Sequence, residues 1–209
     1  GRQSTAFRFR EGEDIAVVED HGRCLGSSAW ESSFHLARFL ALDGSYTTPV
    51  GGCFSAIELG CGIGLPGLCA VRLGGRVTLT DKDEVLPVTR ANVSANALGG
   101  QVSVRELLWE DALLPAGRAH QEKYDLVLAA DVVYSPACYP GLAATLVACT
   151  HGASVVLLAY RQRHESDASF FQALSGPFSL DIVWSSDASL PPAVCGAAAD
   201  RRSARGLSG

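Results

Sequence analysis

Short apolar segments alternate with helix-length segments of mixed polarity between residues 54 and 184. Strands are predicted at 54–59, 76–81, 101–107, 124–131, 153–160 and 178–184, and helices at 65–73, 83–98, 139–149 and 166–174. Strands that alternate with helices of this length form a parallel sheet covered on both faces. Right-handed crossovers then predict an α/β fold, a doubly wound, Rossmann-like sandwich with a mostly parallel sheet.

The first part of the chain does not follow this alternation. Residues 6–10 and 15–19 flank a turn-like segment and predict a β-hairpin. Ser28, followed three residues later by Glu31, resembles a capping box at the start of a helix. The chain has 209 residues, the size of one domain. We expect a single domain over 1–184, with an N-terminal hairpin and helix at 1–53 and a Rossmann-like core at 54–184.

The end of the chain has a different composition. Residues 185–209 contain no periodic apolar pattern and no run of β-branched or aromatic residues. A segment of this kind buries too little apolar surface to offset the entropy of ordering. We therefore expect a disordered tail.

Composition excludes several classes of protein. The net charge of −5 argues against a surface for DNA phosphates. No apolar run reaches the length of a membrane span, so we expect no membrane partner. The seven cysteines include no C-x-x-C pair, which favours reduced thiols, a cytoplasmic protein and no metal site. Methionine is absent, an initiator included, so we expect a fragment or a processed form.

Three glycines, Gly60, Gly62 and Gly64, follow the first core strand in the segment ELGCGIG. Glycine has no Cβ atom, so the chain can turn sharply and a ligand can lie against its backbone. In a doubly wound sheet this loop lies where the strand order reverses and ligands bind. Asp81, at the end of the next strand, can accept hydrogen bonds from two ribose hydroxyls. Together these residues predict a site for an adenosine-containing ligand.

The spacing alone fits two such ligands. Gly62, Gly64, Gly67 and Asp81 satisfy the fingerprint for a nicotinamide dinucleotide. Glu58 extends the loop to E-x-G-x-G-x-G, which is typical of class I methyltransferases that bind S-adenosylmethionine. A dinucleotide fold also places its glycine loop near the start of the chain, which is not the case here. S-adenosylmethionine is therefore the favoured cofactor, with NAD as the alternative.

A second motif, ADVVY, follows the fourth core strand. It contains Asp131 and Tyr134, at the edge of the sheet where the glycine loop is expected. Many methyltransferases that modify amino groups have an Asp/Asn-Pro-Pro-Tyr motif at this place. This chain keeps the acid and the aromatic residue and lacks the prolines, which argues against a DNA or RNA adenine enzyme. We take Asp131 and Tyr134 as the candidate catalytic residues.

In their order along the chain, the hairpin and the segments SSAW, ELGCGIGLPG, LTD, LLWED and LAADVVY resemble the seven-β-strand lysine methyltransferases of methyltransferase family 16. The resemblance covers about residues 6–184. It implies a cofactor site that, with Glu58 and Gly64 from the glycine pattern, comprises Trp30, Gly60, Cys61, Gly62, Asp81, Trp109 and Ala130. It also implies that Asp131 and Tyr134 face the substrate.

The resemblance implies methyl transfer from S-adenosylmethionine to a lysine of a non-histone protein, such as a chaperone or translation factor. We expect a monomer in the cytoplasm, with the nucleus as a further location. In the family, a seventh, antiparallel strand lies between the fifth and sixth strands. Nothing after Trp184 has a strand pattern, so we expect this strand to be missing. Three other functions remain open, namely a catalytically silent binding module, a small-molecule or RNA methyltransferase, and an NAD-dependent oxidoreductase.

Overall fold

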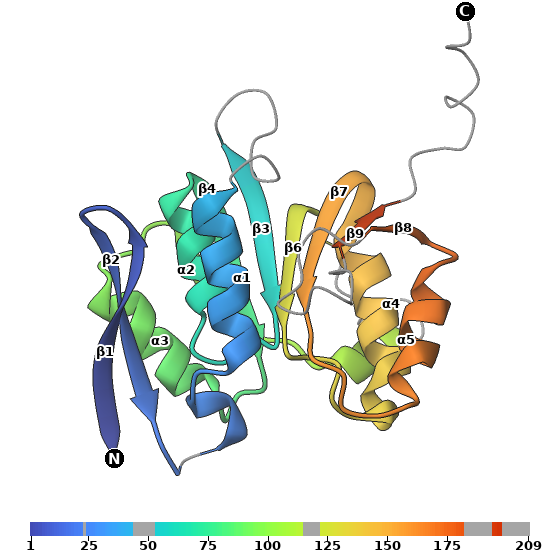
Figure 1. The fold of residues 1–209 in the computed structure, drawn as a ribbon, viewed down its shortest axis with the longest axis horizontal. Helices are drawn as coiled ribbons and strands as arrows, with labels where there is room; N and C mark the ends of the chain where they lie inside the picture. The colour runs from blue at the N-terminus through green and yellow to red at the C-terminus, as the bar shows by residue number, and fades with distance from the viewer. Residues whose placement is uncertain (23, 44–52, 115–121, 182–193, 198–209) are drawn as a thin grey trace, which may run out of the picture.

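The computed structural model describes residues 1–22, 24–43, 53–114, 122–181 and 194–197. Its centre is a seven-stranded sheet with the strand order β5-β4-β3-β6-β7-β9-β8 (Figure 1). Pairs from β5 through β7 are parallel, whereas β9 is antiparallel to both of its neighbours. The bounds are β3 Phe54–Leu59, β4 Gly75–Asp81, β5 Val102–Glu106, β6 Tyr124–Ala130, β7 Thr150–Ala159, β8 Phe178–Asp181 and β9 Val194–Ala197.

Helices cover both faces of the sheet, so the predicted doubly wound α/β sandwich is confirmed (Figure 1). Successive residues of a strand point to opposite faces. Ala56 accordingly belongs to the core on the side of α1 to α3, and its neighbour Ile57 to the core on the side of α4 and α5. The helices are α1 Glu31–Leu42, α2 Leu65–Arg72, α3 Leu86–Ala95, α4 Tyr139–Cys149 and α5 Asp167–Leu174. Every helix in the described ranges is too short or too polar to span a lipid bilayer.

The expectation of a missing seventh strand is wrong. β9 lies between β7 and β8, and its backbone pairs with both. Its sequence, VCGA, has no alternating or β-branched pattern, because a four-residue strand between two partners is held by backbone hydrogen bonds on both sides. The segment predicted as a disordered tail therefore contains a strand, and its other residues lie outside the described ranges. The sixth predicted strand is observed as β8, and residues 182–184 also lie outside those ranges.

The N-terminal hairpin is confirmed as a separate two-stranded sheet, β1 (Arg2–Arg10) and β2 (Glu13–Asp20). Two asparagines, one within α3 (Leu86–Ala95) and one at its C-cap, bind the outer edge of β2. Asn92 accepts a 2.7 Å hydrogen bond from the N–H of Val18 and donates one of 2.8 Å to its carbonyl oxygen. Asn96, one turn later, binds the N–H and carbonyl of Ala16 in the same way. Because both asparagines lie on one face of α3, they satisfy alternate residues of an edge strand.

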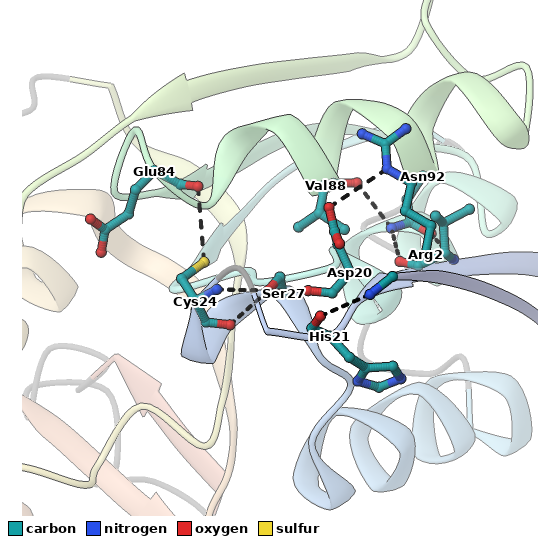
Figure 2. A network of polar contacts seen from close by, with 10 residues as sticks. Arg2, Asp20, His21, Cys24, Ser27, Glu84, Val88 and Asn92 are labelled. Carbon is teal, nitrogen blue, oxygen red and sulfur yellow. Dashed lines mark hydrogen bonds and ion pairs between the residues drawn. The ribbon is translucent and has the colours of Figure 1, made fainter.

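We expect Asn92→Ala to lower the free energy of unfolding by about 2–4 kcal/mol, because it leaves the N–H and carbonyl of Val18 without partners. Asn92 is buried and also donates to the carbonyl oxygen of Val88 (Figure 2). Urea denaturation measures the loss. Ser94→Ala, at an exposed position of the same helix, is the control and should change stability by less than about 0.5 kcal/mol. Equal stability of the two variants would contradict the role assigned to Asn92.

The start of α1 differs from the prediction. The helix begins at Glu31 with Trp30 as its N-cap, and no side chain caps it. Ser28, the predicted capping residue, instead has its Oγ 3.1 Å from Nδ1 of His21. The helix thus begins two residues later than predicted, and a 3-10 turn, η1 (Leu25–Ser27), precedes Ser28.

Polar contacts fix η1 relative to the hairpin and α3 (Figure 2). Oγ of Ser27 lies 2.9 Å from the carbonyl oxygen of Asp20 and accepts a hydrogen bond from the N–H of Cys24. Sγ of Cys24 lies 3.9 Å from the carbonyl oxygen of Glu84, just before α3. The hairpin therefore holds the segment from Cys24 to Trp30 in a defined position, where it forms part of the site described next.

Candidate functional site

A cavity of about 560 Å³ opens at the carboxyl ends of β3, β4 and β6. This is the switch point of the sheet, where doubly wound folds bind ligands, and the volume suits a ligand the size of a nucleoside. The lining comes from six parts of the chain. They are residues 24–33 around η1 (the η1 segment), the carboxyl ends of β3, β4, β5 and β6 with the loops that follow them, and the loop between β7 and α5. In the described part of the chain, no three His, Cys, Asp or Glu side chains are grouped to hold a metal ion.

The loop after β3 brings bare backbone to the cavity. Gly60 and Gly62 line it and have φ angles of 61° and 53°, a left-handed conformation that favours glycine. A Cβ atom on Gly60 would lie 2.9 Å from Val132 and 3.1 Å from the ring of Trp109. Glycine at this position thus allows the indole to pack directly on the loop. Gly64, predicted to contact the cofactor, does not line the cavity, and a Cβ there would lie 2.9 Å from Leu79 in the core.

Glu58, a candidate cofactor-site residue near the end of β3, lines the cavity and also links β3 to α2. Its Oε2 accepts a 2.7 Å hydrogen bond from the N–H of Gly67 in α2. Burial raises the pKa of Glu58 to about 8, although the hydrogen bond from Gly67 opposes the shift. The carboxyl group is therefore largely protonated at neutral pH in the protein without ligand.

This raised pKa predicts a pH-dependent stability. Because the folded state holds the Glu58 proton more tightly than the unfolded state, stability from this group is complete below about pH 4.5 and is lost as pH rises towards about 8. Glu58→Gln keeps an acceptor for Gly67 and does not ionise. Between pH 5.5 and 8 the wild type should lose about 1–3 kcal/mol more unfolding free energy than this variant, measured by urea denaturation. Parallel pH profiles would contradict a buried, protonated Glu58.

Asp81, at the end of β4, faces the glycine loop across the cavity. Its Oδ2 accepts a 2.8 Å hydrogen bond from the N–H of Gly62, and its Oδ1 accepts one of 2.8 Å from the N–H of Lys82. Burial raises the pKa of Asp81, while these two hydrogen bonds work in the opposite direction. A carboxylate can accept about four hydrogen bonds, so each oxygen keeps capacity for one ribose hydroxyl.

Trp109 lines the cavity from the first position of η3 (Trp109–Leu113). Its backbone packs against α4 at Gly141, where a Cβ atom would lie 2.9 Å from the carbonyl of Trp109. An indole held in this way offers a flat face on which an adenine can stack. Ala130 and Cys61 complete this part of the lining. Burial raises the pKa of the Cys61 thiol, so it acts as a small packing group and not as a nucleophile.

Trp30 and the neighbouring residues of the η1 segment form the part of the cavity lining that comes from the N-terminal region of the chain. Nε1 of Trp30 donates a 3.1 Å hydrogen bond to the carbonyl oxygen of Leu25, and 42% of the residue is exposed. Leu25 itself is 78% exposed. This side of the cavity therefore presents apolar surface to solvent at its mouth.

Asp131 and Tyr134, the candidate catalytic residues, both line the cavity. Asp131 has a φ angle of 59°, a conformation that few residues other than glycine, asparagine and aspartate adopt. Oδ2 of Asp131 accepts a 2.5 Å hydrogen bond from Nη2 of Arg163, whereas Oδ1 is buried and has no partner among the described residues. Tyr134 is 43% exposed, and partial burial raises the pKa of its hydroxyl.

Arg163 is a site residue that the sequence analysis missed. It belongs to the loop between β7 and α5, where no local pattern marks it. Asp167, buried at the start of α5, holds this loop by accepting hydrogen bonds from the N–H groups of Arg163 and His164. The hydroxyl of Tyr139 donates to the other carboxylate oxygen of Asp167. Burial opposes the ionisation of Asp167, but these hydrogen bonds outweigh it and lower its pKa.

Comparison with known proteins gives the site its context. Residues 10–176 match the model of a family described as lysine methyltransferase. The chain belongs to this lysine methyltransferase family. It is 42% identical over 132 residues to the protein N-lysine methyltransferase METTL21A of Danio rerio, a match that spans 61% of this chain and 58% of the relative. It is 31% identical to the EEF1A lysine methyltransferase 3 of Mus musculus, over 87% of this chain and 76% of the relative.

A solved structure supports the fold. The 16S rRNA methyltransferase RsmC of T. thermophilus, in complex with AdoMet and guanosine, superposes with a TM-score of 0.67 at 14% identity. The match covers 94% of this chain and 50% of RsmC. Membership of the lysine methyltransferase family removes the NAD-dependent oxidoreductase from the open alternatives. Every residue inferred from the family resemblance lines the one cavity: Trp30, Gly60, Cys61, Gly62, Asp81, Trp109, Ala130, Asp131 and Tyr134.

Proposed function

We propose that this chain transfers a methyl group from S-adenosylmethionine to the side-chain amine of a lysine in a protein. One observation carries the proposal. A single cavity is lined by two groups of residues. The first is Asp81 with the glycine loop, after β4 and β3, and the second is the exposed Tyr134 with Asp131, whose Oδ1 has no partner among the described residues. The first group has the chemistry to hold an adenosine, and the second has the chemistry to hold an amine.

The residues of the first group fit S-adenosylmethionine. Asp81 has acceptor capacity for the ribose hydroxyls, and Trp109 has a face for the adenine. The backbone of Gly60 and Gly62 allows the amino-acid part of the cofactor to approach closely. When bound, the cofactor supplies a methyl group on a positively charged sulfur, and the bond to nitrogen forms as the carbon–sulfur bond breaks and its electrons return to sulfur.

The residues of the second group act on the acceptor. A lysine attacks only as the free amine, and its ordinary pKa is about 10.4. Asp131 accepts a hydrogen bond from the amine through Oδ1 and orients the nitrogen lone pair towards the methyl group. Tyr134 packs against the aliphatic stem and offers its hydroxyl at the cavity mouth. The proton of the lysine leaves to solvent, so Asp131 aligns the acceptor without serving as a strong base.

The acceptor is a protein and not a free amine, because apolar side chains surround the mouth of the cavity. Leu25, Trp30 and Tyr134 are all at least 42% exposed there and can contact the residues that flank a lysine. A relative is named for its action on EEF1A. We accordingly include a translation factor of this kind, or a chaperone, among the acceptors to be tested. The presence of β9 removes the reason for which a catalytically silent module was considered.

Two measurements test the proposal. S-adenosylhomocysteine should raise the unfolding temperature of the protein, whereas NAD should not, because only a ligand of the native state stabilises it. The protein should also transfer a labelled methyl group from S-adenosylmethionine to lysine in a protein of a cell lysate. Stabilisation by S-adenosylhomocysteine without any transfer to protein would identify a binding module. Stabilisation by NAD alone would contradict the proposed cofactor.

A further inference from the structure

Arg163 lies between two residues that line the cavity, the candidate catalytic residue Asp131 and the aromatic residue Trp30. Its Nη2 donates to Oδ2 of Asp131, and its guanidinium carbon is 5.7 Å from the centre of the Trp30 ring. Three segments that are far apart in the sequence, the η1 segment, the loop after β6 and the loop after β7, meet at this guanidinium group. The ion pair with Asp131 raises the pKa of Arg163 further above its usual range, so Arg163 stays charged throughout any assay range.

The two oxygens of Asp131 differ in their surroundings. Oδ2 is held by Arg163, while Oδ1 is buried without a partner in the described part of the chain. An unpaired buried carboxylate oxygen carries a desolvation cost, so a ligand that donates a hydrogen bond relieves it. Because Asp131 lines the cavity, the acceptor amine is the natural donor.

The position of Arg163 is set from two sides. Asp167 holds the loop by accepting from the backbone N–H of Arg163 at 2.8 Å and from that of His164 at 3.1 Å. Trp30 supports the guanidinium through a cation–π contact. The Asp131 side chain is 8% exposed and that of Arg163 is 35% exposed, so solvent screens their interaction from the side of Arg163.

We propose that Arg163 is a positioning residue for the acceptor lysine. Its guanidinium group turns Oδ1 of Asp131 towards the amine and offsets the negative charge of the Asp131 carboxylate. This inference rests on the proposed lysine methylation. A carboxylate without a counter-charge would stabilise the bound ammonium ion and keep it protonated, which would prevent attack. With Arg163 in place, the lysine amine donates its hydrogen bond to an oriented oxygen of Asp131. The pair formed by Asp131 and Arg163 has zero net charge. The bound lysine can then lose its proton at a lower pH.

Other charged and titratable groups also face this region, and all of them are kept in the variants below. They lie on the loops and helices around the cavity and comprise Glu31, Glu58, Asp81, Lys82, Glu84, Glu110, Tyr134, Cys138, His164 and Asp167. Burial raises the pKa of Glu58 to about 8 in the protein without ligand, so Glu58 is a group that can contribute to the pH profile. Its contribution to the pH profile is common to wild type and variants, so a difference between their profiles reports on the residue that was changed.

The test measures kcat as a function of pH for the wild type and for Arg163→Gln. The methyl acceptor is the protein that becomes labelled in the lysate experiment. Glutamine can still donate a hydrogen bond to Asp131 but carries no charge. In this variant the midpoint of the kcat–pH profile, the pH at which kcat reaches half of its maximum, should rise by about 1 pH unit or more. For each pH unit of this shift, kcat near pH 7 should fall about tenfold. At high pH kcat should return towards the wild-type value. Arg163→Lys restores the charge and should restore the midpoint.

The matched control is Arg161→Gln. Arg161 lies two residues earlier, is 76% exposed, does not line the cavity and pairs at 3.5 Å with Glu31. The Arg161→Gln variant should have the same midpoint of the kcat–pH profile and the same KM as the wild type. A uniform fall of kcat at every pH in Arg163→Gln, with an unchanged midpoint, would overturn the inference and indicate a purely structural role.

A second measurement does not depend on any acceptor. In the nitrogen NMR spectrum of the full chain, rotation of the Arg163 guanidinium should be slow in the wild type and fast in Asp131→Asn. Glu165→Gln, at an exposed position of the same loop, should keep the slow rotation. Free rotation in the wild type would overturn the inference. Failure of the wild type to methylate any protein at any pH would contradict the proposed function, and the NMR result would still decide whether Arg163 holds Asp131.

Discussion

Replacing Asp81 with alanine is expected to weaken the binding of S-adenosylhomocysteine by about a hundredfold or more. The change removes two hydrogen bonds from ribose hydroxyls to a charged acceptor, each of which contributes about 1.5–3 kcal/mol. It also leaves the N–H of Gly62 without its 2.8 Å partner, so the loop that receives the cofactor loses a restraint. About 1.4 kcal/mol corresponds to a tenfold change in Kd. Isothermal titration calorimetry measures the loss directly.

Asp83→Ala provides the control for this effect. Asp83 is exposed, lies two residues beyond Asp81 and does not line the cavity, so the same change of charge should leave Kd within about threefold of the wild type. Asp81→Asn keeps one acceptor and should show an intermediate loss. If Asp81→Ala and Asp83→Ala bound the ligand equally well, Asp81 could not be the residue that holds the ribose.

We expect Asp131→Asn to lower kcat by about 10²–10⁴-fold, the range found when a group that positions a proton or a nucleophile is removed. The amide offers the acceptor amine a weaker hydrogen-bond acceptor. It also leaves the charge of Arg163 without its partner next to the incoming lysine. Asparagine tolerates the left-handed φ of 59°, so the backbone should be preserved. Single-turnover methyl transfer measures the rate.

The same variant should bind S-adenosylhomocysteine with nearly wild-type affinity, because Asp81, and not Asp131, is the acid assigned to the ribose hydroxyls. Glu165→Gln removes an equal charge from an exposed position and should keep wild-type kcat. Full activity of Asp131→Asn would refute the role assigned to this acid. A parallel loss of cofactor binding and of kcat would mean that Asp131 supports the cofactor site instead of the acceptor.

Features encoded by neighbouring residues were predictable from the sequence. The glycine loop, Asp81 and Asp131 each follow a strand, and in a parallel sheet the carboxyl ends of strands meet at one edge. Their convergence on one cavity could therefore be expected before any coordinates were known. The two faces of the sheet were likewise predicted from apolar strands alternating with helices.

Features that depend on distant partners were not predictable in this way. β9 is a strand because its backbone pairs with β7 on one side and with β8 on the other. Its sequence, VCGA, has no strand pattern of its own. Arg163 is indistinguishable from Arg161 in the sequence. The hydrogen bonds that its loop donates to Asp167, and its contacts with Trp30 and Asp131, place it at the cavity. Gly64 has the spacing of a cofactor-binding glycine, but its neighbours Leu79 and Thr89 use the space that its missing side chain leaves.

The cavity has a wall from each half of the chain. Cys24 to Trp30 supplies one side, and Asp131 and Arg163, both after β5, supply another. Neither half of a split protein, divided between β5 and β6, would hold all the groups that the substrates need. A nucleoside bridging the halves would act as a template for their reassembly, so this fold lends itself to ligand-driven reconstitution from two fragments.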